Sequence, residues 1–252
     1  MIRYLALLLL FVAPPADAET VVAGLSLDSI GITASFNGSE VIIFGAVKRD
    51  APEPPGPPLE VIVTLEGPSG AVTIRKKNRQ AGVWINTEQV GVAAAPSFYS
   101  VATTGPLASI LDPAEDLRQR ISVPLAMRSF SGPLQVDDPT SFTEALLRIR
   151  ESEGLYGLSE GSVQLVEGTL FRANFRLPAN LIEGNYKTRI FLLRDGKVID
   201  AHHAALPVRK IGLEGWLFAL SRQNPWAYGI ISLLLAALAG WIASAAFRLL
   251  RS

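Results

Sequence analysis

The chain of 252 residues has no cysteine and only two histidines, His202 and His203. Without cysteine there is no disulfide, thiolate zinc site, iron–sulfur cluster or cysteine nucleophile. Charged residues make up only 18% of the sequence, and 23 basic residues balance 23 acidic ones, which excludes a globally basic nucleic-acid binder. Neighbouring histidines in a strand point to opposite faces, so they do not share a metal. Phosphate-loop, G-x-G-x-x-G and G-x-S-x-G motifs are missing as well. We predict no enzymatic activity, cofactor or metal.

Apolar residues make up 49% of the chain, and the longest apolar runs lie at its two ends. Residues 1–18 have the form of a secretory signal peptide. Arg3 precedes the apolar residues 4–12, Pro14-Pro15 breaks the helix, and Ala16-Asp17-Ala18 is a typical cleavage site. Nine apolar residues are too few to cross a bilayer, so we expect cleavage rather than anchoring.

The carboxyl-terminal end has the opposite character. Residues 223–247 carry no charge, which predicts a transmembrane helix over residues 224–247 with Trp226, Tyr228 and Trp241 near its edges. The preceding residues 213–223 form a short amphipathic juxtamembrane segment whose apolar face comprises Leu213, Trp216, Leu217 and Leu220. We expect export by the signal peptide to place residues 19 to about 222 outside the membrane, with a single crossing and the tail 248–252 on the cytoplasmic side.

The intervening residues predict a mainly β fold, an immunoglobulin-like β-sandwich ectodomain with a small helical insertion. We expect residues 19–105 to form its first part, residues 106–160 the insertion, and residues 161–212 its second part. Two separate small sandwiches are the alternative. Residues 41–47 are continuously apolar and predict a strand buried on both faces, whereas residues 59–66 alternate as in a half-buried strand. Trp84 is expected to anchor the core.

Local signals fix several turns and helix ends. Asp195-Gly196 predicts a two-residue hairpin turn. Asp112-Pro113-Ala114-Glu115 and Ser141-Phe142-Thr143-Glu144 predict two helix starts, with Gly154 after the end of the second helix.

Two groups of basic residues are candidate surfaces for an anion or an acidic partner. The first group lies in a run before Trp84 and consists of Arg75, Lys76, Lys77 and Arg79. The second group alternates with apolar residues and consists of Arg172, Arg176, Lys187 and Arg189. If their strands are neighbours, the second group forms one patch, which binds a ligand or pairs with acidic residues of the insertion. The first group is either a contact site or a solvated hairpin end.

Small residues recur every fourth position in the transmembrane segment, a spacing that lets two helices approach closely. They are Ser232, Ala236, Gly240 and Ser244. This pattern favours packing on a partner helix or on a second copy, although small residues are also common in membrane helices generally.

Most of the mature chain resembles a family of alphaproteobacterial transmembrane proteins without an assigned activity. The likeness is carried by Phe44-Gly45-Ala46, Gly67-Pro68, the run from Val72 to Trp84, Gly184-Asn185-Tyr186 and the apolar carboxyl-terminal span. The resemblance implies an inner-membrane protein with a periplasmic domain. Members of that family tend to be encoded near predicted sulfite or sulfonate exporters, which implies an accessory subunit of an anion transporter and transfers no catalytic residue.

The leading hypothesis is therefore a single-pass inner-membrane protein that acts as a non-enzymatic accessory module. Its partners would be the membrane and an integral-membrane protein, transporter-like, or a second copy through the transmembrane helix, and no nucleic acid. The alternative is a membrane-tethered periplasmic protein that binds a small anion.

Overall fold

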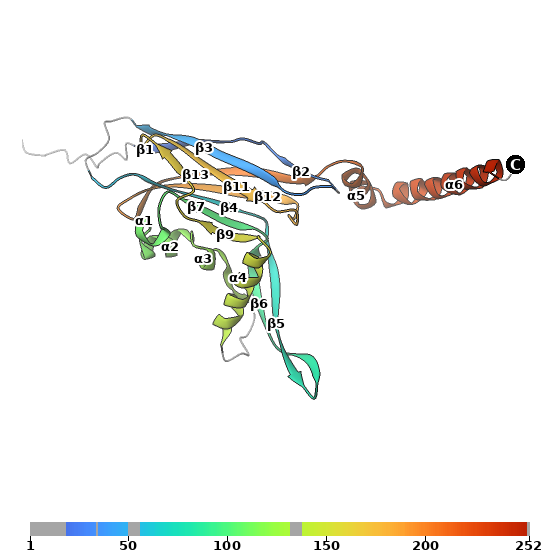
Figure 1. Ribbon diagram of the computed structural model, residues 1–252, viewed down its shortest axis with the longest axis horizontal. Helices are drawn as coiled ribbons and strands as arrows, with labels where there is room; N and C mark the ends of the chain where they lie inside the picture. Colours follow the sequence, from blue (N-terminus) through green and yellow to red (C-terminus); the bar gives the residue numbers. More distant parts are fainter. Residues whose placement is uncertain (1–18, 34, 50–55, 132–137, 251–252) are drawn as a thin grey trace, which may run out of the picture.

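The structure is a computed structural model that describes residues 19–33, 35–49, 56–131 and 138–250. The predicted signal peptide and the last two residues of the predicted tail lie outside this part. The described chain has a β-rich head and a carboxyl-terminal helix that extends away from it (Figure 1). The mainly β fold with an apolar carboxyl-terminal helix is therefore confirmed.

Two sheets pack face to face in the head. The four-stranded sheet has the order β1 (Glu19–Leu25), β3 (Ser39–Arg49), β11 (Leu170–Leu177) and β10 (Gln164–Val166). The six-stranded sheet has the order β2 (Ile30–Ile32), β13 (Lys197–Lys210), β12 (Gly184–Arg194), β4 (Glu60–Glu66), β7 (Tyr99–Thr103) and β9 (Tyr156–Ser159). Because β3 pairs with β11 and β4 with β12, strands from both sides of the insertion build one sandwich. Its immunoglobulin-like character stays a prediction.

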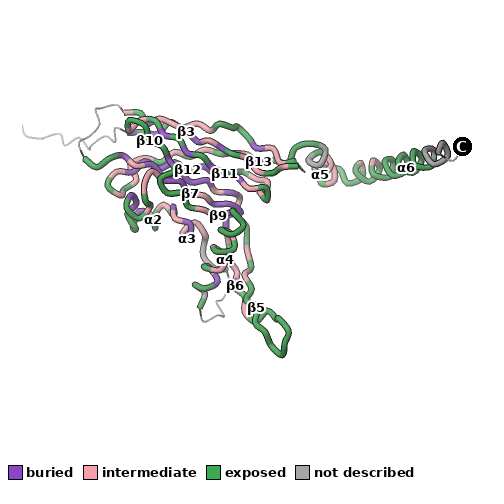
Figure 2. Tube along the Cα trace, in the orientation of Figure 1, coloured by how far each residue is buried: buried purple, intermediate pink, exposed green. Residues whose placement is uncertain are grey.

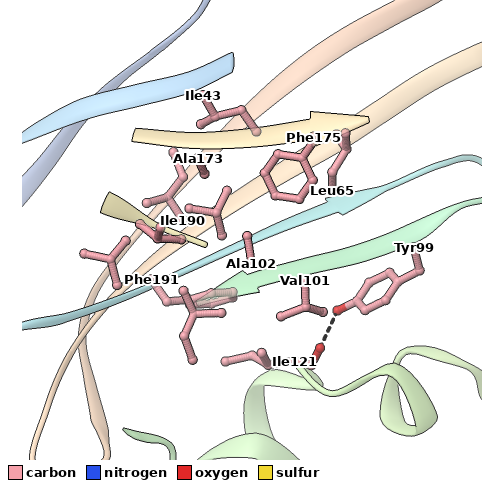
Figure 3. Packing of buried hydrophobic residues seen from close by; sticks show 14 of the residues in the cluster. Ile43, Leu65, Tyr99, Val101, Ala102, Ile121, Ala173, Phe175, Ile190 and Phe191 are labelled. Atoms are coloured by element: carbon pink, nitrogen blue, oxygen red, sulfur yellow. Dashed lines mark hydrogen bonds between the residues drawn. The ribbon is translucent and has the colours of Figure 1, made fainter. Parts of the chain in front are cut away.

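The described part of the insertion contains four helices and contributes β9 to the six-stranded sheet. These helices are α1 (Leu107–Ile110), α2 (Pro113–Gln119), α3 (Val123–Ala126) and α4 (Pro139–Ser152). Ile110, Ile121 and Val123 from this segment belong to the main core. Figure 3 shows Ile121 against the side of the six-stranded sheet that carries Phe191 and Val101. The six-stranded sheet is thus covered on both faces, by the four-stranded sheet and by the insertion.

This layering reverses the predicted burial of two strands. β3 was expected to be buried on both faces, but it alternates, and Phe44 on its outer face is 48% exposed. β4 was expected to be half-buried, yet its residues 61–65 are all buried. The insertion covers β4 on the face that the alternation assigned to solvent, and the buried Thr64 hydroxyl accepts a hydrogen bond from Arg189.

Turns and helix ends were predicted more accurately from the sequence than the burial of strands. Asp195 and Gly196 both have positive φ and join β12 to β13 in a tight hairpin, as predicted. The Asp112 side chain caps α2 by accepting a hydrogen bond from Ala114 N, and Gly154 has φ +69° just after α4. The predicted start of α4 at Ser141 is wrong, because Asp138, three positions earlier, is the residue that caps this helix.

A third, smaller sheet projects from the head. It consists of β5 (Ser69–Gln80), β6 (Val83–Pro96) and β8 (Arg128–Ser131). Its base is held by a second small core in which Val92, Ala95 and Leu146 are buried and Val72 and Ile74 are partly buried. β8 reaches only as far as Gly91 of β6. Beyond that point the β5–β6 hairpin continues as two strands, green for exposed in Figure 2.

Two helices follow the last strand. α5 (Leu213–Gln223) occupies the segment predicted to be juxtamembrane, and α6 (Pro225–Leu250) contains the predicted membrane span.

At the opposite end of the sandwich the strand β1 begins with Glu19, whose carboxylate binds the Arg49 and Arg194 guanidinium groups at 2.8 and 2.9 Å. Burial raises the pKa of Glu19, but the hydrogen bonds from these two arginines outweigh burial and leave the pKa below its ordinary value.

Candidate contact surfaces of the head and of the membrane helix

The distal part of the β5–β6 hairpin, residues 75–89, is called the arm here. Its tip is a two-residue turn in which Ala81 and Gly82 have φ values of +49° and +86°. Positive φ at both central positions is the type I′ geometry that matches the twist of a two-stranded ribbon. The two strands stay paired down to this turn, with Gln80 opposite Val83. The arm is therefore a continuous hairpin with one irregularity, where the register shifts between Lys76 and Lys77.

Trp84 lies at the tip of the arm, so the prediction that it anchors the core is wrong. Its side chain is 65% exposed, and the neighbouring Val83 and Ile85 are 63% and 40% exposed. A tryptophan more often packs against apolar neighbours from several elements. Here the second core ends near Val90, and within the described residues no other element reaches the tip. The polar residues around the tryptophan, Gln80 and Asn86, were the sequence signal for its exposure.

The arm brings the first group of predicted site residues together. Arg75, Lys76, Lys77 and Arg79 are all exposed on β5. Because successive strand residues alternate between faces, three of these cations share one face and Lys76 lies on the other. Lys76 Nζ contacts Glu88 Oε1 at 3.4 Å across the hairpin. Trp84 is the partner of Arg79 in the register and hence shares the face of the three cations.

That face is called the cationic face, and it carries Arg75, Lys77, Arg79 and Trp84. At the base of the hairpin the opposite face carries Val72 and Ile74, which pack toward Leu146 of α4. Figure 1 shows α4 on the side of the hairpin that is turned away from α6. The cationic face therefore begins, at Arg75, on the side toward α6.

The second group of predicted site residues does not form one patch. Its strands β11 and β12 belong to different sheets, which contradicts the condition on which the patch depended. Arg172 and Arg176 are exposed on the outer face of the four-stranded sheet, since Phe171, Ala173 and Phe175 between them are buried inward. Lys187 and Arg189 lie on the far side of the six-stranded sheet, with the insertion. The whole sandwich separates the two pairs.

Arg189 is an internal connector. Its Nη atoms donate hydrogen bonds to the carbonyl oxygens of Gln119 at 2.8 Å and Arg120 at 3.1 Å, where α2 ends. They also donate to Tyr99 Oη at 2.9 Å, and Tyr99 Oη in turn donates to the Ile121 carbonyl at 2.7 Å (Figure 3). Burial raises the pKa of Tyr99 to about 12, so the phenol stays a donor. A guanidinium held in this way has little capacity left for a soluble anion.

A polar pocket of about 240 Å³ lies beside Arg189, and it is the nearest match to the predicted anion site. Its lining includes Arg118, Arg120 and the carboxylate residue Glu66. Arg118 is paired with Glu115 of the same helix. The pocket thus combines both signs of charge. In the described chain no ion pair joins the insertion to Arg172, Arg176 or Lys187, so the predicted pairing with the acidic insertion is absent there as well.

The predicted packing face of the membrane helix lies along α6. Ser232, Ala236, Gly240 and Ser244 follow one side of the helix and are exposed. The apolar stretch Pro225–Ser244 is 20 residues long, enough to cross about 30 Å of hydrocarbon, and none of it is buried against the head. His202 and His203 are adjacent on β13, and the described residues contain no group of three or more His, Asp and Glu suited to a metal.

In the part of the chain that the structure describes, a β-rich head with one exposed apolar helix fits a single-pass membrane protein. The chain belongs to the family described as "Putative transmembrane protein (Alph_Pro_TM)", whose model matches residues 20–249. This confirms the family resemblance seen in the sequence.

Comparison with curated protein sequences finds no match. Among solved structures, the sporulation control protein Spo0M from Bacillus subtilis aligns with 11% identity and a TM-score of 0.28. The alignment covers 82% of this chain and 55% of that one, so the chain spans little more than half the length of Spo0M. A similarity at this level carries no argument about fold or function.

Proposed function

We propose that the protein is a non-enzymatic accessory module of the bacterial inner membrane, with its head in the periplasm and its carboxyl terminus in the cytoplasm. The observation that carries this proposal is the relation of α6 to the head. The apolar stretch of α6 leaves the head without burying any of its length. Its whole circumference is therefore available to lipid and to another membrane helix, while the head is held close to the same neighbour.

The side of α6 that faces the partner is the one with small residues. Gly240 and Ala236 remove side-chain bulk over a full turn, and close backbone approach is what stabilises helix pairs in lipid, where apolar burial gives no net gain. The proposed partner is an integral-membrane protein, and the family resemblance noted in the sequence suggests an exporter of sulfite or sulfonate anions. A second copy of the chain would use the same face.

The alternative of a small-anion-binding protein receives less support. The arginines that such a site needed are on opposite sides of the sandwich, and Arg189 is bound to backbone carbonyls. We therefore assign the anion, if one is transported, to the partner and not to the head.

The test is purification of the full chain from its own membranes in a mild detergent. We expect a multi-pass protein to co-purify with the wild type and to be lost from Gly240→Ile, because the added side chain separates the helices. Ala239→Ile introduces the same side chain about 100° around the helix and should keep the complex. A wild type that purifies alone, or two variants that behave alike, would refute the proposal.

A further inference from the structure

The arm has a composition that the proposed function does not use. It places a tryptophan, Val83 and Ile85 in solvent at the end of a projecting hairpin, where apolar exposure has a cost. Beside them, three cations alternate along one strand. The described residues put a carboxylate only near Lys76, on the opposite face. Exposed apolar and cationic side chains therefore share one element. Among the described residues no carboxylate forms an ion pair with Arg75, Lys77 or Arg79, and Arg79 Nε donates a hydrogen bond to the Gly82 carbonyl oxygen at 3.4 Å within the tip.

We infer that the cationic face of the arm docks on the surface of the bilayer that holds α6, with Trp84 at the level of the lipid headgroups. Tryptophan is enriched at that level because its ring is apolar and its N–H is polar. Arginine and lysine bind the phosphates of anionic lipids, and each such residue that lies close to the bilayer surface adds to the free energy of binding. Arg75, Lys77 and Arg79 supply these contacts in a row.

The geometry of the fold favours the bilayer as the occupant. The arm runs across the direction of α6 (Figure 1), so it extends along the membrane when α6 spans it. A twisted hairpin in this position can present the residues near its tip, Lys77, Arg79 and Trp84, to a flat surface. The face with Val72 and Ile74 is used by the second core, whereas the cationic face starts on the side of α6. With about seven residues per strand beyond β8, the arm reaches roughly 20 Å out from the head.

Docking at two points would fix the head on the membrane. α6 alone leaves the head able to turn about the junction of α5 and α6, where Asn224 follows α5 and Pro225 begins α6. A second contact by the arm removes this freedom. The arm therefore determines which part of the head a neighbouring membrane protein meets.

The experiment uses the full chain in lipid nanodiscs, with Trp216, Trp226 and Trp241 replaced by phenylalanine so that Trp84 is the only tryptophan. In discs containing phosphatidylglycerol we expect a blue-shifted Trp84 emission and quenching by brominated lipid. In discs of phosphatidylcholine alone both signals should weaken. The variant Arg75→Gln/Lys77→Gln/Arg79→Gln should reduce the docked-to-undocked ratio about 100-fold.

A charge-matched control removes three other exposed cations, in Arg172→Gln/Arg176→Gln/Lys187→Gln, and should keep the docked signal. Water-like Trp84 emission in both kinds of disc would overturn the inference. An equal loss in the control would also overturn it, because only net charge would then matter. If Trp84 is shielded in native membranes but exposed in purified nanodiscs, the arm binds a protein and the bilayer is the wrong occupant. None of these outcomes depends on Gly240 or on co-purification.

Discussion

Arg189 is the residue whose side chain holds two parts of the head together. It binds two carbonyls at the end of α2 and the Tyr99 hydroxyl, and thereby attaches the insertion to β12. Arg189→Ala removes the guanidinium hydrogen bonds to all three acceptors, so we expect the free energy of unfolding to fall by about 2 kcal/mol. Urea unfolding of the full chain in mild detergent, followed by circular dichroism, measures this change.

Arg172→Ala is the matched control for Arg189→Ala. Arg172 is exposed on the four-stranded sheet, and its Nε donates a hydrogen bond to Asn174 Oδ1 at 3.1 Å on the same strand. Its replacement should change the free energy of unfolding by less than about 0.5 kcal/mol. Equal effects of the two substitutions would show that the hydrogen bonds of Arg189 carry no special weight.

Arg172 and Arg189 also show which features could be predicted from the alternation of residues along a strand and which could not. Each alternates with apolar neighbours in the sequence, and that alternation correctly assigned both to the faces opposite the core side of their strands. It could not tell that the two strands lie in different sheets, because strand pairing joins residues far apart in the sequence. It also could not tell that one of these faces is covered by the insertion.

At the scale of the element, β3 depends on a glycine. A Cβ atom added to Gly45 would lie 2.5 Å from the Val22 carbonyl oxygen and 2.6 Å from the Phe171 ring. Gly45→Ala therefore forces β1 or β11 away from β3, and we expect a loss of about 1 to 3 kcal/mol, seen as a lower Tm of the head. Gly157→Ala in β9 meets nothing within 4 Å and should leave Tm nearly unchanged.

Elements defined by their own residues were predicted well from the sequence. The Asp195-Gly196 turn, the Asp112 cap and the apolar stretch of α6 each depend on a few neighbouring residues. Elements whose burial depends on distant parts of the chain were not predicted well. β4 is buried on both faces, although exposure of one face was expected, because helices from another part of the chain cover it. β3 has the exposed face that was expected of β4. Trp84 was misassigned because its hairpin extends past the small core that holds its base.

At the scale of the whole molecule, we predict how the chain is oriented in the membrane. Protease added to spheroplasts of a bacterium that produces the protein should digest the head and leave a fragment that contains α6 and the tail. The reason is that export delivers the head across the membrane while the apolar stretch of α6 stays within it. Antibodies against each end would identify the fragment. A head that survives protease outside but is cleaved after lysis would place it in the cytoplasm.

The direction of the last strand has a mechanical consequence. β13 runs lengthwise through the head and leads through α5 into the membrane helix, so any pull on the tether enters the head at the end of β13 (Figure 1). Its hydrogen bonds to β12 lie across the strand direction, over the length from Lys197 to Val208. A load applied along the strand is shared by all of these bonds in shear. The head can thus bear tension from a moving membrane neighbour without unzipping from its attached end.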